Sequence, residues 1–238
     1  MKTHLLITRP RDSCAETAEI VRMAGFQPLL APALDIRFIE TSYPDPALFD
    51  AVMFSSQNAI RAMMRRASDP SWFSKKTFCV GDRTEALARQ LGFHDIYNAH
   101  GTMGDLTTLI QKTLVPPARL AHFRGVDIRE DPAGTLRPDR GWTIDPVILY
   151  ETHPVSDLPD DVVSALGQGT VRGVLFYSPK TARSFLRGLE KAGFLAATAG
   201  MKAFCLSGAV VESLRHTTWS DILVAPTPDQ TGMTAILN

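Results

Sequence analysis

The sequence lacks several features that mark common classes of protein. Its three cysteines are an odd number without CxxC spacing, which argues against a disulfide framework and against a zinc site. Its six histidines form no pairs at the spacing that metal ligands share on a helix, so no metal is implied. No apolar run approaches the roughly 18 residues of a membrane span, and the start of the chain leads straight into a strand-like run. We therefore expect a soluble, cytoplasmic protein.

The sequence also lacks an excess of charge of either sign. Lys plus Arg and Asp plus Glu both number 25, which excludes the overall basic field of many nucleic-acid-binding proteins. No GxGxxG fingerprint and no glycine-rich loop with a Walker lysine is present, so nucleotide binding has weak support. No Ser-His-Asp or Cys-His set can be assembled from spacing. A protein of this composition that binds a polyanion has to gather its arginines locally.

The cysteines are Cys14, Cys79 and Cys205, and two of them lie in apolar, strand-like runs. Free cysteine is among the most buried residue types. We interpret these thiols as buried structural groups in preference to reactive ones.

What the sequence does contain is an internal repeat that crosses over itself. The run that ends at Phe54, followed by small polar residues, is echoed by the run that ends at Phe176, and Cys79 is echoed by Cys205. In the other direction, the run from Leu5 to Arg9 matches 120–124. With 238 residues, the chain has room for two lobes of about 100–150 residues each. Two similar lobes commonly form a cleft in which small molecules bind.

Short apolar runs alternate with segments of helical periodicity along the whole chain. This alternation predicts parallel sheets with helices on their faces, and ligands of such sheets bind beyond the carboxyl ends of the strands. The expected pairs of strand and helix are 5–8 with 13–24, 51–54 with 58–65, 77–80 with 83–91, 95–97 with 104–114, 173–176 with 181–192, and 202–206 with 210–216. Further strands are expected at 120–123 and 222–224.

Two extended, proline-bearing segments, 27–36 and 143–152, occupy equivalent positions of the repeat. Proline in a strand belongs at an edge or a crossing point, so we interpret them as paired connectors. The first lobe then contains residues 1–34 plus 152–238 and the second contains 37–149, with linkers near 27–37 and 143–153. The two linkers form a hinge of two strands.

The turns that follow the strands carry the candidate binding residues. Free N–H groups and the positive dipole end at a helix N-terminus bind carboxylates or phosphates. Either serine alone is more simply a helix N-cap, but matched turns in both halves favour a shared anion site. The residues are Ser55, Ser56, Asn58, Ser178, Pro179 and Lys180, together with Gly81 and Ser207 in the next pair of turns.

Arginines follow the first strand of each half. Arg9 and Arg124 occupy matching positions, and Arg129 follows the second of them closely. Guanidinium groups pair bidentately with carboxylates, so these arginines are candidates for an acidic ligand. Tyr150 closes an apolar run at the expected hinge, where its hydroxyl could serve as a general acid or its ring could only anchor the hinge.

These residues together resemble the uroporphyrinogen-III synthase family over nearly the whole chain. The resemblance rests on Ile7-Thr8-Arg9-Pro10, the Phe54–Ala59 turn, Val80-Gly81 with Thr84, Phe123-Arg124-Gly125 with Arg129, Leu149-Tyr150-Glu151, Phe176-Tyr177-Ser178-Pro179 and Ala225-Pro226-Thr227. Each motif is short, and their order within the crossed repeat makes the combination specific.

The resemblance implies two flavodoxin-like α/β lobes, joined by a two-stranded linker, with the substrate between them. It implies that linear hydroxymethylbilane loses its terminal hydroxyl as water and closes to uroporphyrinogen III with ring D inverted, through an azafulvene and a spiro intermediate. It implies no cofactor. Hydroxymethylbilane carries several carboxylates, which agrees with the arginines and helix N-termini noted above.

The resemblance also assigns residues. The family's tyrosine on the return linker, which assists departure of the hydroxyl, corresponds to Tyr150, and its threonine in the glycine turn corresponds to Thr84. Thr227 lies in the late motif and joins the substrate-binding set. The turn at Ser207-Gly208-Ala209-Val210 departs from the family's glycine and threonines, which leaves its backbone N–H groups as binding elements. The chain stops early in a terminal helix, which suggests a trimmed version of the fold.

The main hypothesis is the cyclising synthase. The alternative is a non-catalytic two-lobed domain that binds or senses a tetrapyrrole or another polycarboxylate, because fold alone does not determine function. A sensor would normally carry an output module, and none is visible. We expect a monomer without nucleic-acid or membrane partners, with transient contact to the preceding pathway enzyme.

Overall fold

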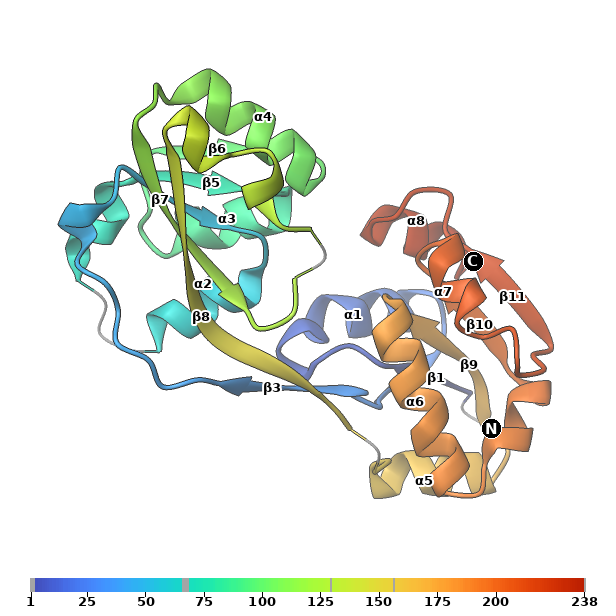
Figure 1. The fold of residues 1–238 in the computed structure, drawn as a ribbon. Helices are drawn as coiled ribbons and strands as arrows, with labels where there is room; N and C mark the ends of the chain where they lie inside the picture. Colours follow the sequence, from blue (N-terminus) through green and yellow to red (C-terminus); the bar gives the residue numbers. More distant parts are fainter. Residues whose placement is uncertain (1–2, 66–68, 129, 156, 238) are drawn as a thin grey trace. The chain divides into compact units, whose positions relative to one another are not determined.

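The computed structural model describes residues 3–65, 69–128, 130–155 and 157–237. The chain divides into two compact units (Figure 1). Unit 1 contains Met1–Ile36 and His153–Asn238, and unit 2 contains Arg37–Thr152. No helix within the described residues is long and apolar enough to cross a membrane.

Unit 1 is built on a parallel sheet with the strand order β11-β10-β9-β1-β2. Its strands are β1 (His4–Ile7), β2 (Gln27–Leu30), β9 (Val171–Phe176), β10 (Lys202–Cys205) and β11 (Asp221–Val224). Its helices are α1 (Ala15–Met23), α5 (Asp160–Gly167), α6 (Pro179–Lys191), α7 (Gly208–Glu212) and α8 (Gln230–Ala235). The expected alternation of strand and helix is therefore present, and it places the carboxyl ends of these strands along one edge.

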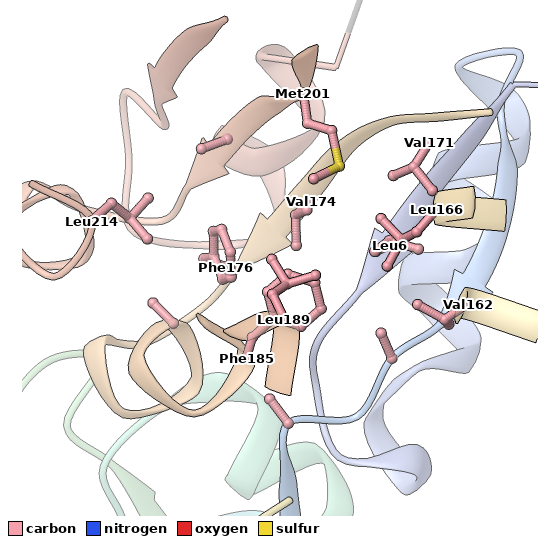
Figure 2. Close-up of a cluster of buried hydrophobic side chains, with 14 of the residues drawn as sticks. Leu6, Val162, Leu166, Val171, Val174, Phe176, Phe185, Leu189, Met201 and Leu214 are labelled. Carbon is pink, nitrogen blue, oxygen red and sulfur yellow. The ribbon is translucent and has the colours of Figure 1, made fainter. Parts of the chain in front are cut away.

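The strands of unit 1 bury opposite faces against different helices. Leu6 of β1 packs in a cluster with residues of α5, α6 and α7, including Phe185 and Leu189, which Figure 2 shows beside Val174 and Phe176. Its neighbours Leu5 and Ile7 belong to another cluster, with side chains of α1 and α8. Successive residues of a strand point to opposite faces, so the unbroken apolar run of β1 is that of a strand covered on both sides.

Unit 2 repeats this arrangement. Its sheet has the order β3-β8-β7-β4-β5-β6, and the pairings of β8, β7, β4, β5 and β6 are parallel. Its strands are β4 (Ala51–Phe54), β5 (Lys76–Cys79), β6 (Ile96–Asn98) and β7 (Ala118–Gly125), and its helices are α2 (Gln57–Met64), α3 (Asp82–Gln90) and α4 (Met103–Thr113). The strands β3 (Leu34–Phe38) and β8 (Trp142–Pro154) run across the boundary between the units.

Short 3-10 helices occupy several of the connections. They cover Arg11–Ser13, Pro46–Leu48, Pro70–Ser74, Pro132–Gly134, Pro138–Arg140 and Leu195–Gly200. Three of them begin with an aspartate cap and a proline, at Asp45, Asp69 and Asp131. A proline at the first helical position costs no hydrogen bond, because the N–H that it lacks would have no partner there.

The crossed repeat is visible in the register of the strands. Cys205 lies opposite Phe176 in unit 1, and Cys79 lies opposite Phe54 in unit 2. Both sheets follow the flavodoxin order when β1 and β7 are taken as first strands: β2-β1-β9-β10-β11 and β8-β7-β4-β5-β6. The fold class predicted from the sequence, two α/β lobes with parallel sheets, is confirmed.

The expected connectors are partly strands of the two sheets. Gln27–Leu30 is β2, which pairs with β1 along its whole length, and Pro28 is accommodated because β2 is an edge strand. In the same way, β8 pairs with β7 from Trp142 to Tyr150. The N–H of Ile39 bonds to the oxygen of Leu149 and that of Val155 to Ala33, so β3 and β8 run antiparallel. Extended proline-bearing runs look alike in strands and linkers, so the sequence alone did not reveal that parts of both segments pair within the sheets.

All three cysteines are buried. Burial raises the pKa of the Cys79 thiol to about 12 and that of Cys205 to about 12. A thiol that stays protonated at neutral pH is a poor nucleophile, so these two groups are inert parts of the cores, as their sequence context indicated.

Candidate active site

A cavity of about 520 Å³ opens at the carboxyl edge of the sheet of unit 2. It lies where β4, β5 and β7 end, where the pairing of β8 with β7 ends and where α4 begins. The residues that line it are Ser55, Ser56, Val80, Gly101, Thr102, Met103, Asp127, Ile128, Glu130 and Tyr150. The volume is that of a typical small-molecule site, and the position is the one at which parallel sheets bind ligands.

Tyr150 forms one wall of this cavity. It lies opposite Gly125 in the pairing of β8 with β7, and 8% of the residue is exposed. The ring lies directly against Gly125: a Cβ there would be 2.7 Å from the ring Cε2 and 2.8 Å from Cζ. Glycine at position 125 is therefore required for the tyrosine to hold this position.

The surroundings of the phenol act on its acidity in opposite directions. Burial raises the pKa of Tyr150, and the Asp127 carboxylate adds to this increase, whereas hydrogen bonds with the Ser56 side chain and with the Gly125 backbone lower it. The increase prevails, so the hydroxyl is protonated at neutral pH. A protonated phenol with little exposure can donate a proton or a hydrogen bond to a bound molecule.

Ser56 connects this phenol to α2. It is the N-cap of that helix, and its Oγ accepts a hydrogen bond from the Asn58 N–H at 3.1 Å. The Asn58 side chain accepts from Arg61 Nη1 at 3.5 Å and is not part of the cavity lining. Ser55, Ser56 and Tyr150 are thus the sequence candidates that the structure brings together around the cavity.

Gly81 and Thr84 mark the start of α3. Gly81 is the N-cap, and a Cβ at this position would meet nothing within 4 Å, so the packing of the fold does not require glycine there. Thr84 is 7% exposed and its N–H donates to the Gly81 oxygen. Gly81 leaves the backbone open to a ligand, whereas the side chain of Thr84 is largely covered.

Arg124 is half-buried near the end of β7. Its Nη1 donates to the carbonyl oxygens of Gly125 and Val126 at 2.9 and 3.0 Å, so this guanidinium also stabilises its own turn. It is not among the residues that line the cavity. Arg129, the other arginine predicted here, lies outside the described residues.

The carboxyl edge of unit 1 carries a different cluster. The guanidinium of Arg9 lies 4.4 Å from the centroid of the Tyr177 ring. Its Nη1 donates to Gln230 Oε1 at 3.2 Å and to Thr17 Oγ1 at 3.4 Å. Gln230 also bonds to the Tyr177 hydroxyl. Residues that follow β1 and β9 thus join the first turn of α8, and they hold one face of the guanidinium against an aromatic ring.

The other candidates of unit 1 follow its remaining strands. Ser178 caps α6 by accepting from the Thr181 N–H at 3.1 Å, with Pro179 and Lys180 in the first turn. Ser207 is the N-cap residue of α7, but its side chain makes no capping bond. Thr227 is exposed, and its Oγ1 donates to Asp229 Oδ1 at 3.0 Å. All of them lie at the edge where ligands of parallel sheets bind.

Comparison with known proteins agrees with this architecture. Residues 15–235 match the family model described as "Uroporphyrinogen-III synthase HemD". The chain belongs to this family. Members of the uroporphyrinogen-III synthase family are cyclising lyases of haem biosynthesis.

Individual relatives are distant. A protein of Methanothermobacter thermautotrophicus, provisionally named a uroporphyrinogen-III synthase, is 26% identical over 204 residues, which cover 77% of this chain and 76% of that protein. The crystal structure of uroporphyrinogen-III synthetase from Helicobacter pylori has a TM-score of 0.65 at 16% identity and covers 99% of this chain and 98% of that one. A mutant uroporphyrinogen-III synthase from Thermus thermophilus has a TM-score of 0.53 at 16% identity, with 99% and 96% covered. These two structures share the fold.

The sequence did not reveal all residues that line the cavity of this protein. Gly101, Thr102, Met103, Asp127, Ile128 and Glu130 line it but were not predicted. The signal for Thr102 was present, because Thr102 and Asp105 form a capping box at the start of α4. The loop that contains Asp127 and Glu130 has no such signature.

A second group that spacing did not reveal lies beside the start of α3. Asp82, Glu85 and His100 each place a potential metal-ligating atom within 4.8 Å of the others. Their polar atoms already bond to one another and to Asn98, whose Nδ2 lies 2.8 Å from both carboxylates. The hydrogen bond from His100 and then that from Asn98 lower the pKa of Asp82. We interpret the group as a hydrogen-bonded surface network.

Proposed function

We propose that this protein is a uroporphyrinogen-III synthase that converts linear hydroxymethylbilane into uroporphyrinogen III. In this reaction the terminal hydroxyl leaves as water, ring D is inverted and the macrocycle closes without a cofactor. The observation that carries the proposal is the protonated, largely buried phenol of Tyr150 in a cavity at the carboxyl edge of a parallel sheet, in a chain of this family.

The chemistry mainly requires that the chain of four pyrroles be folded correctly and that the leaving hydroxyl receive a proton. Both demands suit a rigid site with one well-placed acid. We assign the acid to Tyr150, whose position opposite Gly125 fixes the ring. A hydroxide ion is a poor leaving group, and a proton from the phenol converts it to water as the carbon–oxygen bond breaks.

The charges around the cavity support a division of substrate groups. Its lining includes two carboxylates, Asp127 and Glu130, which repel the carboxylates of the substrate and attract its pyrrole N–H groups. A carboxylate near the reacting carbon also stabilises the positive charge that develops on the pyrrole when the hydroxyl leaves. We therefore assign the cavity to the reacting pyrrole end.

The substrate carboxylates are assigned to the cationic and N–H-rich positions on both sheet edges. Guanidinium forks and helix N-termini bind such groups. We propose Arg9, Arg124 and Arg129 as the cationic contacts. The further binding residues that we propose are Ser55, Asn58, Gly81, Thr84, Ser178, Pro179, Lys180, Ser207 and Thr227. We assign Ser56, which the sequence grouped with them, to a role beside Tyr150.

We also propose that the lobes of the enzyme comprise residues 1–34 plus 152–238 and residues 37–149, in line with the two compact units. A monomeric state, a cytoplasmic location and a transient contact with the preceding enzyme of the pathway stay predictions. Light scattering of the purified protein, alone and mixed with that enzyme, measures the first and the last of these.

The experiment that tests the function supplies freshly made hydroxymethylbilane, oxidises the products and separates the uroporphyrin isomers by chromatography. A protein-free control closes spontaneously to isomer I. We expect isomer III above that background. Isomer I alone, from protein whose circular dichroism shows it to be folded, would instead favour the alternative of a non-catalytic domain that binds or senses a tetrapyrrole, which no observation at present supports.

A further inference from the structure

The phenol of Tyr150 lies beside two groups that belong to neighbouring strand ends. Gly125 lies opposite Tyr150 in the β7–β8 pairing and in contact with its ring. Ser56, which follows β4, lines the same cavity, and its side chain and the Gly125 backbone are the two hydrogen-bonding groups that lower the pKa of the phenol. Since β4, β7 and β8 are adjacent strands of one sheet, the backbone fixes the spacing of all three residues.

The hydrogen bonds of Ser56 determine which way its own proton points. Its Oγ accepts from the Asn58 N–H at 3.1 Å, as the N-cap of α2. A hydroxyl that accepts from the helix keeps its one proton for another acceptor. The Tyr150 oxygen is such an acceptor, and it is free to receive a bond whenever the phenol gives its own proton to a ligand.

We propose that Ser56 is a positioning residue that acts through Tyr150: its hydroxyl and the Gly125 N–H both donate to the phenol oxygen, and they stabilise the phenolate that forms when Tyr150 protonates the leaving hydroxyl. This inference rests on the proposed function. Two donors that converge on an oxygen where negative charge develops form the arrangement that lowers barriers in oxyanion holes.

Every proton and electron pair in this step can be accounted for. The carbon–oxygen bond of the hydroxymethyl group breaks with both electrons going to oxygen, which takes the Tyr150 proton and leaves as water. The pyrrole system carries the positive charge, also after the new carbon–carbon bond has closed the ring, until a pyrrole carbon loses a proton. The proton then lost from the pyrrole carbon is equivalent to the one that restores the phenol, so the enzyme is unchanged after each turnover.

The need for such donors follows from the burial of the phenol. Burial raises the pKa of Tyr150, and the nearby Asp127 carboxylate raises it further, both of which make the phenol a weaker acid. The bonds from Ser56 and Gly125 act in the opposite sense. Of these two donors, the Gly125 N–H belongs to the backbone, so Ser56 is the one that a substitution can remove.

The test is a double-mutant cycle on the rate of isomer III formation at saturating hydroxymethylbilane. Glycine is nearly as good an N-cap as serine, so Ser56→Gly removes the hydroxyl and largely preserves α2. We expect this variant to lower kcat by about tenfold, the size of one hydrogen bond to a charged group, and to leave KM within about twofold. In the Tyr150→Phe background the same substitution should change the rate by less than about twofold.

One further variant and two contrary outcomes distinguish this role of Ser56 from others. Ser56→Thr retains the hydroxyl and the cap, and it should restore most of the rate lost in Ser56→Gly. An equal loss from Ser56→Gly in both backgrounds would contradict the proposal, because Ser56 would then act on the substrate or on α2 directly. A loss confined to KM would contradict it as well.

These outcomes are distinct from a failure of the proposed function itself. If the wild-type protein forms only isomer I, it is not a synthase. If Tyr150→Phe retains the full rate, Tyr150 is not the acid. If the wild type forms isomer III and Tyr150→Phe is slow, but the two substitutions do not couple, only the role of Ser56 is wrong.

Discussion

The strands of unit 1 and unit 2 pair in the same register, but different side chains lie at the ends of equivalent strands. Ile7 lies opposite Leu175 in unit 1, and His122 lies opposite Met53 at the equivalent position of unit 2. Beyond these strands, unit 1 presents Arg9 stacked on Tyr177, whereas unit 2 presents the Tyr150 phenol. The repeated scaffold thus fixes where residues are held, and the residues at the strand ends determine what each edge can do.

The difference suggests a division of labour. The edge of unit 1 joins a guanidinium, a ring and an amide, which suits recognition of substrate carboxylates. The edge of unit 2 places a protonated phenol among hydrogen-bond donors and carboxylates, which suits proton transfer and stabilisation of positive charge. On this account, substitutions in unit 1 change substrate binding and those around Tyr150 change the rate of ring closure.

The largest effect is expected from Tyr150→Phe, which removes one oxygen atom from unit 2. We expect kcat for isomer III to fall by about a hundredfold or more, because the leaving hydroxyl loses its proton donor, while KM stays within about threefold. Tyr97→Phe is the matched control, since it removes a hydroxyl that bonds to Lys76 Nζ at 2.9 Å in the same unit. Equal turnover of the two variants would remove Tyr150 from the mechanism.

The acid stability of the two units should differ because only unit 2 has a histidine at the matched position. His122 is 2% exposed and its Nε2 has no partner among the described residues. Burial, and then the charge of Arg124, lowers the pKa of His122 from 6.5 to about 4. The unfolded chain therefore binds a proton more readily, so stability is lost as the pH falls from about 6.5 to 4, by about 3 kcal/mol.

His122→Ile gives unit 2 the residue that unit 1 has. We expect this variant to lose most of that acid sensitivity, as measured by hydrogen exchange of each unit at pH 7 and at pH 4.5. Exchange that resolves the two units is needed because a chain with two lobes does not have to unfold in one step. If the substituted protein were as acid-sensitive as the wild type, carboxylates and not His122 would govern the transition.

Substitutions of the arginines at the two edges should also have different effects. Arg9→Ala removes a guanidinium that is held by side chains, and we expect KM to rise by about tenfold with kcat within about twofold, since a charged hydrogen bond contributes about this much. Arg124→Ala should raise KM as well but also lower the unfolding temperature, because Arg124 bonds to the Gly125 and Val126 carbonyls. Unaltered KM in both variants would place the carboxylate sites elsewhere.

The smallest effect is expected from substitutions at the two matched helix caps. Ser56 caps α2 and Ser178 caps α6, each through one backbone N–H at 3.1 Å. Replacement of either serine by alanine should lower the free energy of unfolding of its own unit by about 1 kcal/mol, as measured by urea titration with exchange that resolves the units. A clearly larger loss for Ser56→Ala would show that its bond to Tyr150 also stabilises the fold.

Much of the fold could be predicted because it is local and repeated. The apolar runs of β4 and β9 and the helices after them are visible in the sequence, and their echo identifies the equivalent positions. The pairing of β2 with β1 and of β8 with β7 could not be predicted, because it depends on residues distant in the sequence. For the same reason α5, which packs on the sheet of unit 1, was not predicted.

The site was predictable only in part. Ser55, Ser56 and Tyr150 were chosen separately, and the sheet order that brings β4 and β8 near β7 makes them neighbours. The contact between Gly125 and the ring of Tyr150 requires the register of two strands, which no spacing rule supplies. Arg124 looked like a free ligand for carboxylates, yet its guanidinium bonds to two carbonyls of its own turn.

The most direct test of the division of labour is a measurement of the turnover number for isomer III at saturating hydroxymethylbilane, made side by side on wild type, Tyr150→Phe and Arg9→Ala. We expect Arg9→Ala to reach a rate close to that of wild type once the substrate is saturating, whereas Tyr150→Phe stays slower by about a hundredfold. A rate deficit of similar size in both variants at saturation would contradict the assignment of binding to one edge and proton transfer to the other.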